Sequence, residues 1–341
     1  MPADEAPVQT KKAKATIYDV AQQAGVNPST VSRALSNPGR VSPQTRRLVE
    51  ITAGVLNFQA NHSAQVLQTG STRMLGLLVS DITNPNFFGI LREAGRVATQ
   101  QQYSVVLGNA AESAATELSA ARRLIKTVDG LILVSPRMSE SNLQLLAATK
   151  KVVAINREVS GIDCVVPDPD RGVSQAVRFL AGNGHQKIVF AAGPEMSWMS
   201  ARRWDAVSDA CEWCHVTAER IESTSPTIDG GRKLARTIKA SGATAVITHN
   251  DLMAIGLMHE LQGTGIAVPE AISIVGFDDI FGADFTTPSL SSIRSPLGEC
   301  GSLAAGLILN SFAGTPHDPQ SVMVDTELVI RGSAGPARSA S

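Results

Sequence analysis

Two short amphipathic segments, at residues 16–24 and 27–35, come first in the pattern of hydrophobic and polar positions. Apolar side chains recur at helical spacing in the first of them, at Ile17, Val20, Ala21 and Ala24. That spacing predicts a helix with one buried stripe. Thr16 is its expected N-cap, and Asp19, three residues later, is placed to hydrogen-bond the capping residue in return. Gly25 then supplies a turn, because it adopts positive φ without steric cost.

The second segment has distinct inner and outer faces. Asn27 and Pro28 fit the N-cap and the first position of a helix. The inward positions are Val31, Ala34 and Leu35, and the outward positions are Ser29, Thr30, Ser32 and Arg33. Small hydroxyls and an arginine on the outer face of such a helix suit the major groove of DNA. The two segments therefore indicate a DNA-binding helix-turn-helix, although two short helices with a glycine turn also occur in other folds.

Two further helices are expected before the pattern changes. Ser42 and Pro43 begin a third helix by the same cap-then-proline logic, and it should run to about Asn57. Its predicted buried face consists of Leu48, Ile51, Val55 and Leu56. Asn61 then caps a short helix that ends at Gly70. At about nine residues this helix is too short to be stable alone in water, so we expect it to form only on DNA.

From Met74 onward, short apolar runs alternate with helix-like segments. The runs are residues 74–80, 103–109, 130–135, 152–156, 187–193, 245–248 and 272–278. Continuous β-branched and leucine-rich runs are typical of strands buried on both faces, and their alternation with helices predicts a parallel α/β sheet. The runs are too many for one small sheet, so we expect two lobes.

Charge divides the chain at the same place. Residues 11–73 hold eight Lys or Arg against two Asp or Glu, a net charge of +6, whereas the whole chain carries −1. A basic head on an acidic body fits a head that meets DNA phosphates. The sequence has no apolar run long enough for a membrane helix and no secretory signal pattern, so we expect a cytoplasmic, nucleoid-associated protein without a membrane partner.

One motif suggests a different chemistry. Cys211, Cys214 and His215 spell C-x-x-C-H, the pattern of haem attachment. That attachment needs export, and Cys211 falls on the apolar stripe of a helix with Val207, so a buried cysteine is the better interpretation. The six histidines show no ligand spacing, and no Ser-His-Asp or paired-carboxylate arrangement can be argued from the sequence. We expect no catalytic residue, no metal site and no cofactor.

The chain resembles the lac-repressor family of bacterial transcription regulators. The matching segments are TIYDVAQQAGV, TVSRAL, NPGRVSPQTR and NHSAQVLQTGSTRMLGLLV, and the resemblance continues to about residue 332. It implies an all-α helix-turn-helix head and an α/β core of two Rossmann-like lobes, similar to a type I periplasmic binding protein. The implied parts are a disordered arm at 1–14, the helix-turn-helix domain at 15–60, a hinge helix and linker at 61–73, an effector-binding and dimerisation domain at 74–332 with crossovers near 168, 294 and 322, and a disordered tail at 333–341.

On this resemblance, a homodimer binds a pseudo-palindromic operator in double-stranded DNA. The residues expected at the DNA are Thr16, Tyr18, Pro28, Ser29, Thr30, Ser32, Arg33, Asn61, His62, Gln65 and Leu67. Pro28, Ser29 and Arg33 would read the major groove, and Thr30 and Ser32 would hold phosphates. Leu67 would act as a wedge between base pairs in the minor groove. Two departures from the family, Ala60 for Pro and Gln65 for Arg, loosen the entry to the hinge and change one minor-groove contact.

The resemblance also places a small-molecule effector in a cleft at the carboxyl ends of the strands. The expected contacts are Asn86, Phe87, Asn156, Trp198, Arg203, Asn250 and Asp278. Asn86 replaces a usual aromatic, which argues against a stacked flat base, and Asn156 replaces a usual Asp. Trp198 suits the apolar face of a sugar, with packing between the lobes as the alternative. Arg203 and Asp278 fit ligand hydroxyls, with an ion pair that fixes the lobe as the alternative.

These features predict a repressor of sugar or nucleoside catabolic genes that a small polyhydroxylated effector releases from its operator. A regulator that needs its ligand as a co-repressor remains an alternative. A solute-binding protein would fit the body alone, but the basic head and the lack of a signal argue against it. An enzyme is a third class, and it lacks a catalytic constellation here.

Overall fold

The computed structural model describes residues 15–36, 38–58, 70–222, 225–314 and 318–337. Contacts between Cα atoms divide the chain into two compact units, Met1–Thr72 and Arg73–Ser341. Four positions expected at the DNA lie outside the described residues, together with the short helix predicted there: Asn61, His62, Gln65 and Leu67.

The first unit, called the head below, is a small helical domain. Its elements are α1 (Ile17–Ala24), α2 (Pro28–Ser36), η1 (Pro38–Arg40) and α3 (Pro43–Val55). Thr16 caps α1 in a capping box with Asp19, and Gly25 follows the helix with φ 65°. Val20 of α1 and Val31 of α2 are fully buried in the core between the helices. The capping and turn residues thus do what their sequence pattern predicts.

The buried face of α3 differs from the prediction. Leu48, Ile51 and Val55 are 46%, 58% and 70% exposed. The side chains that α3 buries are Val49, Thr52 and Ala53. The two stripes are neighbours on the helix, and the prediction was wrong because it chose the bulkier one. Thr52 is buried at little cost, since its hydroxyl donates to the Leu48 carbonyl at 2.8 Å.

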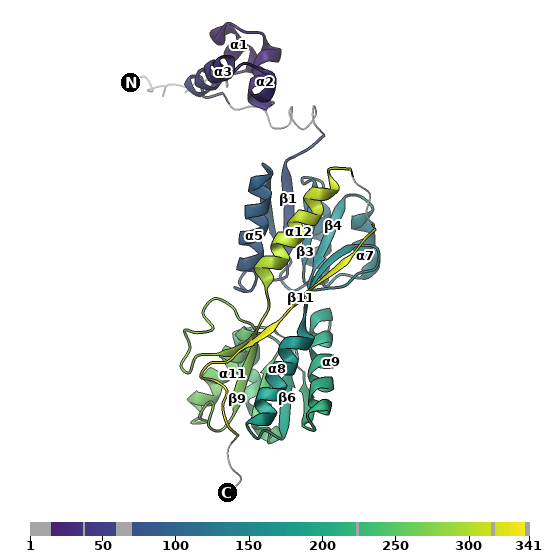
Figure 1. Cartoon of the computed structure of the whole chain (residues 1–341), viewed down its shortest axis with the longest axis vertical. Coiled ribbons are helices and arrows are strands. Elements are labelled where there is room, and N and C mark those ends of the chain that lie inside the picture. The colour runs from purple at the N-terminus through teal and green to yellow at the C-terminus, as the bar shows by residue number, and fades with distance from the viewer. Residues whose placement is uncertain (1–14, 37, 59–69, 223–224, 315–317, 338–341) are drawn as a thin grey trace, which may run out of the picture. The chain divides into compact units, whose positions relative to one another are not determined.

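The second unit is built on two six-stranded sheets (Figure 1). Their strand orders are β11-β5-β4-β3-β1-β2 and β12-β10-β9-β8-β6-β7, and only the β10–β12 pair is antiparallel. The strands are β1 (Met74–Val79), β2 (Ser104–Asn109), β3 (Gly130–Val134), β4 (Lys151–Ile155), β5 (Asp163–Asp168), β6 (Lys187–Ala191), β7 (Thr217–Ile221), β8 (Ala245–Thr248), β9 (Ser273–Asp278), β10 (Ser291–Arg294), β11 (Ser321–Asp325) and β12 (Glu327–Val329). All seven apolar runs form strands.

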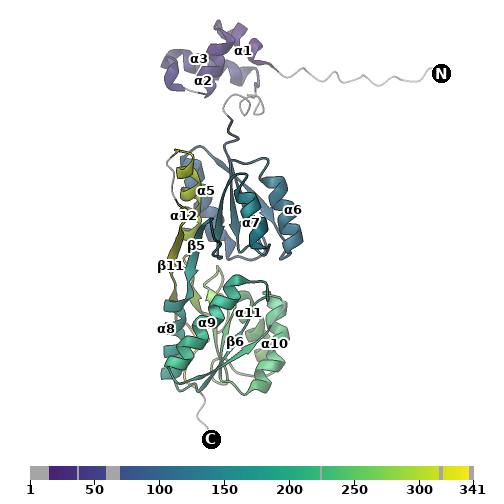
Figure 2. The same cartoon turned by 90° about the vertical axis from the view of Figure 1, so that its right-hand side faces the viewer.

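Helices cover both faces of each sheet (Figures 1 and 2). They are α5 (Phe87–Gln100), α6 (Ala114–Leu124), α7 (Glu140–Ala147), α8 (Pro169–Gly182), α9 (Trp198–Trp213), α10 (Ile228–Ser241), α11 (Asp251–Gly263) and α12 (Leu297–Ser311). In the first lobe, α5 and α12 pack on one face of the sheet and α6 and α7 on the other. In the second lobe, α8 and α9 face α10 and α11 across the sheet. The predicted fold class, a helical head and a two-lobed α/β core, is confirmed.

Three connections join the two lobes. β5 leads into α8, β10 leads into α12, and β11 leads into β12. Thr326, between β11 and β12, donates to the Asp168 carbonyl at 2.7 Å and accepts from the Gly172 N–H at 3.2 Å. The third connection is therefore tied to the first. Such short connections allow two lobes to rotate as rigid bodies.

Candidate functional site

The outer face of α2 in the head carries the residues expected at DNA. Its exposed or partly exposed positions are Pro28, Ser29, Thr30, Ser32 and Arg33. Val31 and Ala34 lie on the opposite, buried side. On α1, Tyr18 is 70% exposed, and the Thr16 hydroxyl is held by Asp19 at 2.7 Å. Every expected DNA residue that the structure describes is thus at least partly open to solvent.

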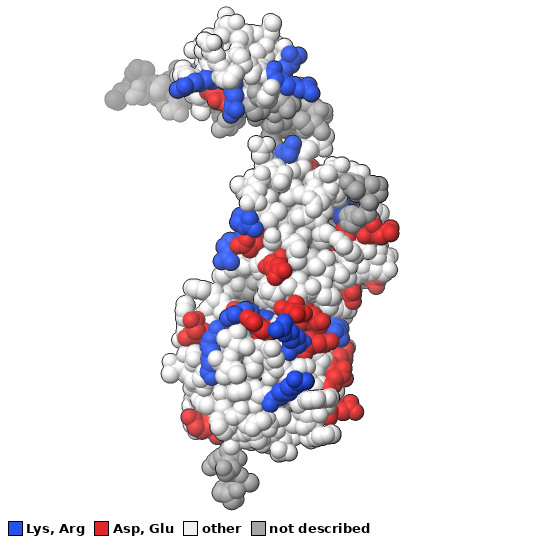
Figure 3. All heavy atoms as spheres, viewed as in Figure 1, with Lys and Arg blue, Asp and Glu red and all other residues white. Residues whose placement is uncertain are grey.

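The described surface of the head is basic. Its charged residues are Arg33, Arg40, Arg46 and Arg47 against Asp19 and Glu50. Both acidic groups are engaged locally, Asp19 in the cap of α1 and Glu50 in an ion pair with Arg46 at 2.6 Å. Figure 3 shows arginines standing out on the surface of the head unit. The remaining positive charge attracts phosphates at long range.

A pocket lies where the carboxyl ends of strands from both sheets meet. Six of the seven residues expected at a ligand line it, namely Asn86, Phe87, Asn156, Arg203, Asn250 and Asp278. Further lining residues, not singled out from the sequence, are Ser80, Asn84, Glu112, Ser135, Arg137, Ser197, Met199, Pro226 and His249. The sequence does contain a signal for several of these lining residues. Arg137 and His249 each follow closely on a buried strand, and open α/β sheets bring such strand-end positions together at one edge.

Trp198 does not line this pocket. It begins α9 and packs against the buried cluster beneath α6 and α7, which includes Leu131 and Met138. Its neighbours Ser197 and Met199 line the pocket instead. The indole thus takes the packing alternative that the sequence left open.

Arg203 and Asp278 form a buried ion pair. Nη2 of Arg203 lies 2.6 Å from Oδ1 of Asp278, and the two side chains are 4% and 2% exposed. The guanidinium also donates to the His249 carbonyl and lies 3.7 Å from the centre of the Phe277 ring. Buried charges persist only when paired and hydrogen-bonded. The pair therefore fixes the second lobe while it presents a carboxylate to the pocket.

One hydrogen bond crosses the pocket from lobe to lobe. Nδ2 of Asn86, at the start of α5, donates to Oδ2 of Asp278, at the end of β9, over 2.8 Å. The space that the lining encloses is about 30 Å³, which suits about two water molecules. A sugar-sized ligand needs more space than this arrangement of the wall leaves.

The first lobe contributes a second ion pair to the pocket wall. Nη2 and Nε of Arg137 donate to Oε2 of Glu112 at 2.9 and 3.1 Å. The segment is held from behind by Glu117, whose carboxylate accepts the backbone N–H groups of Arg137 and Met138. Burial raises the pKa of Glu117. In the same lobe, Asn156 donates to the Ser135 hydroxyl at 2.9 Å.

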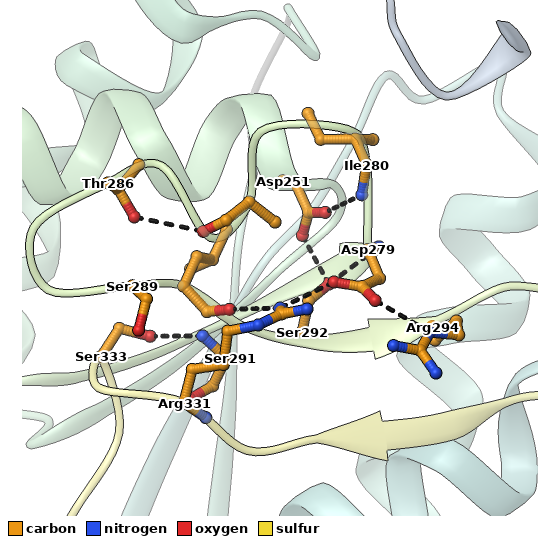
Figure 4. A network of polar contacts seen from close by, with 12 residues as sticks. Asp251, Asp279, Ile280, Thr286, Ser289, Ser291, Ser292, Arg294, Arg331 and Ser333 are labelled. Carbon is orange, nitrogen blue, oxygen red and sulfur yellow. Dashed lines mark hydrogen bonds and ion pairs between the residues drawn. The ribbon is translucent and has the colours of Figure 1, made fainter.

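A buried network holds the turn that presents Asp278 (Figure 4). Asp278 and Asp279 both have positive φ, 101° and 54°, which L residues rarely adopt. The Ser292 hydroxyl accepts the Asp279 N–H at 3.0 Å and donates to the Asp251 carboxylate at 2.6 Å. The other Asp251 oxygen accepts the Ile280 N–H at 2.8 Å. Burial raises the pKa of Asp251 well above its usual range. Hydrogen bonds from residues outside the pocket thus hold this turn in its strained conformation.

His249, in the pocket wall, makes the stability of the folded chain depend on pH. Burial, and after it the charges of Arg203 and Arg137, hold the pKa of His249 well below its usual value. The unfolded chain therefore binds a proton that the folded chain excludes, and stability falls as pH drops through about 6.5. We expect His249→Gln to reduce this loss by about 1.4 kcal/mol per pH unit below pH 6.5.

Urea unfolding at about pH 7 and about pH 5.5 measures this difference. The matched control is His259→Gln, an exposed histidine of α11, which should keep the wild-type pH dependence. An equal pH dependence in wild type and His249→Gln would rule out a buried neutral imidazole.

Another hollow, of about 280 Å³, lies on the surface between α8 and α9. Its lining includes Arg178, whose guanidinium stacks 4.5 Å from the centre of the Trp213 ring, and Cys214. Its walls are helix surfaces that no strand end reaches. Nearby Cys211 is buried, and burial raises the pKa of its thiol to about 12.

Among the described residues, no cluster of three or more potential metal ligands occurs, and no helix has the length and apolarity of a membrane span.

Two family profiles match the chain. The one described as bacterial regulatory proteins, lacI family, covers residues 16–61, and the one described as a periplasmic binding protein-like domain covers residues 177–334. These matches fall on the head and on the larger part of the two-lobed unit.

Relatives and solved structures agree with the profiles. The transcriptional regulator GalS of Salmonella typhimurium is 34% identical over 317 residues, which cover 88% of this chain and 91% of that protein. The repressor CytR of Escherichia coli is 30% identical over 94% of this chain and 96% of that protein. The crystal structure of the lac repressor dimer bound to operator and the anti-inducer ONPF has a TM-score of 0.83 at 25% identity, covering 94% of this chain and 98% of that one. The chain belongs to the lacI family of bacterial regulatory proteins.

Proposed function

We propose that this chain is a transcriptional repressor of sugar or nucleoside genes, which a small polyhydroxylated effector releases from its operator. The observation that carries the proposal is that one chain joins a basic helix-turn-helix head to a strand-end pocket whose walls come from two lobes. The names of GalS, CytR and the operator-bound lac repressor dimer support it. We propose action as a homodimer at the nucleoid in the cytoplasm, without enzymatic turnover.

At the DNA, α2 is the recognition helix. Arg33 and Ser29 are its exposed polar side chains and are placed to read base edges in the major groove, with Pro28 beside them. Thr30 and Ser32 contact phosphates, and Thr16 and Tyr18 at the start of α1 add contacts at the DNA backbone. The other residues proposed to contact the DNA, which lie outside the described residues, are Asn61, His62, Gln65 and Leu67.

In the pocket, the effector acts on the bond between the lobes. Its hydroxyls compete with the Asn86 amide for the Asp278 carboxylate and reach Asn156 in the first lobe, while Phe87 offers an apolar surface. Asn250 shapes the wall as the cap of α11. A ligand that bridges Asn86 and Asp278 changes the preferred angle between the lobes, and that angle biases DNA binding through the hinge.

Selection from a pool of random duplexes, followed by a binding titration, tests the DNA half of this proposal. We expect the full chain to enrich a two-fold symmetric site and to bind it at least about 1,000-fold more tightly than random DNA. A solute-binding protein would bind a sugar and show no enriched site, and that result would refute the proposal.

A further inference from the structure

We propose that the effector is uncharged, a polyol with free hydroxyl groups and without a phosphate or carboxylate group. This inference rests on the proposed function, because it names the class of ligand that the same pocket takes. Three features of the wall carry it: the charges are already paired, amides at the helix N-termini already have hydrogen-bond acceptors, and buried acceptors lack donors.

The charges on the pocket wall neutralise one another. Among the described residues, the lining holds two arginines and two carboxylates, which form the pairs Arg137–Glu112 at 2.9 Å and Arg203–Asp278 at 2.6 Å. Arg137 directs Nε and Nη2 at Glu112, whereas Arg203 directs Nη2 at Asp278 and Nη1 at the His249 carbonyl. Neither guanidinium therefore has a whole bidentate edge free for a phosphate or carboxylate. Nε of Arg203 is buried and has no hydrogen-bond partner. An entering anion would meet a wall whose charges already cancel, with no net positive charge to attract it.

Amides at the helix N-termini near the pocket already have hydrogen-bond acceptors as well. Helices α5, α9 and α11 begin there, and a bare helix N-terminus binds phosphate through its free amides. Ser197 accepts a first-turn N–H of α9 at 3.3 Å, and Asn250 accepts one of α11 at 2.9 Å. The Asn84 side chain accepts the N–H of Asn86 at 3.0 Å. At α5, which has no side-chain cap, the Phe87 and Phe88 N–H groups donate to the carbonyls of Asn84 and Pro85. Amides at all three helix starts thus already have acceptors, which weakens their attraction for an anion.

The wall also presents buried acceptors to which no group donates. Oδ1 of Asn86 and Oδ1 of Asn156 are buried and accept no hydrogen bond, while their Nδ2 groups are engaged with Asp278 and Ser135. Nδ1 of His249 is also buried without a partner. A hydroxyl group donates to such acceptors, whereas an ionised phosphate or carboxylate has no proton to give. Unpaired acceptors in both lobes thus select a ligand rich in hydroxyls.

Matched ligand pairs test this inference on the full chain by isothermal titration calorimetry. The probes are D-ribose and its phosphate ester, D-galactose and galacturonate, and cytidine and cytidine monophosphate. We expect at least one uncharged member to bind and its charged counterpart to bind at least about tenfold more weakly. The inference is overturned if a charged member binds as tightly as its parent, or if no uncharged member binds.

A charge variant gives a second test. Glu112→Gln keeps the shape of the side chain and frees the Arg137 guanidinium, so the penalty against the charged counterpart should fall at least about tenfold. The control is Glu140→Gln, an exposed glutamate of α7 in the same lobe, which should leave the penalty unchanged. An unchanged penalty in Glu112→Gln would contradict the argument from paired charges.

Operator binding separates the failure of this inference from the failure of the proposed function. If a charged ligand binds the pocket and releases the operator, the proposed function stands and the uncharged class is wrong. If an uncharged ligand binds and the operator complex does not respond, the inference stands and the proposed control of DNA binding is wrong.

Discussion

Replacing Asp278 with alanine is expected to lower the free energy of unfolding by about 3–5 kcal/mol. The carboxylate is the ion-pair partner of Arg203, whose side chain is 4% exposed. Removing it leaves a guanidinium charge buried without a counterion, and it also removes the acceptor of the bond from Asn86. Urea unfolding followed by circular dichroism measures the change in stability.

Two further variants show whether the ion pair is the cause. Asp205→Ala removes an exposed carboxylate from α9, the helix that carries Arg203, and should cost less than about 0.5 kcal/mol. The double variant Arg203→Met with Asp278→Ala removes both charges and should recover most of the lost stability. If the double variant is no more stable than Asp278→Ala, the unpaired charge does not explain the loss.

Arg33→Ala is expected to weaken binding to the selected operator by about 1–3 kcal/mol per half-site. The proposed homodimer uses two copies, so the total loss is about 2–6 kcal/mol, or at least about 30-fold in affinity. The exposed guanidinium on α2 is the reason, since α2 buries its opposite face and has no other exposed charge. Fluorescence anisotropy with the operator and with single-base variants of each half-site measures the loss and the relaxed specificity.

Two controls separate base reading from general attraction to DNA. Thr30→Ala should weaken operator and random DNA alike, because a phosphate contact carries no sequence information. Arg232→Ala removes an exposed arginine of α10 in the second unit and should leave both affinities unchanged. If Arg33→Ala kept the affinity and the base preference of wild type, α2 would not read bases through Arg33.

Local pattern predicted most of the fold. Capping by Thr16 and the turn at Gly25 depend on neighbouring residues, and the apolar runs mark strands buried on both faces. Five strands had no such run, namely β5, β7, β10, β11 and β12. β7, β11 and β12 lie at sheet edges, where polar side chains meet solvent, as in TAERI of β7. β10 is short and lies inside its sheet, but two of its four residues are buried serines, so its apolar signal is weak as well. The buried face of α3 was predicted wrongly because two adjacent stripes of side chains on that helix both fit the helical periodicity.

The pocket was only partly predictable for a different reason. Residues such as Asn156 and Asp278 end buried strands, and strand ends meet at one edge. Arg137 and Glu112 pair across 25 positions of sequence, and no local pattern reveals that pairing. The prediction for Trp198 failed for another reason. Trp198 is next to pocket residues in sequence, but it lies at the start of a helix, where successive side chains point in different directions.

The central claim, that a small uncharged effector controls operator binding, is tested most directly by titrating a preformed operator complex with the uncharged ligand that binds the chain most tightly. Fluorescence anisotropy of labelled operator reports the bound fraction. The account predicts that the operator is released, with half-release near the ligand concentration that half-fills the pocket. An operator complex that stays intact, or tightens, at saturating ligand would contradict it.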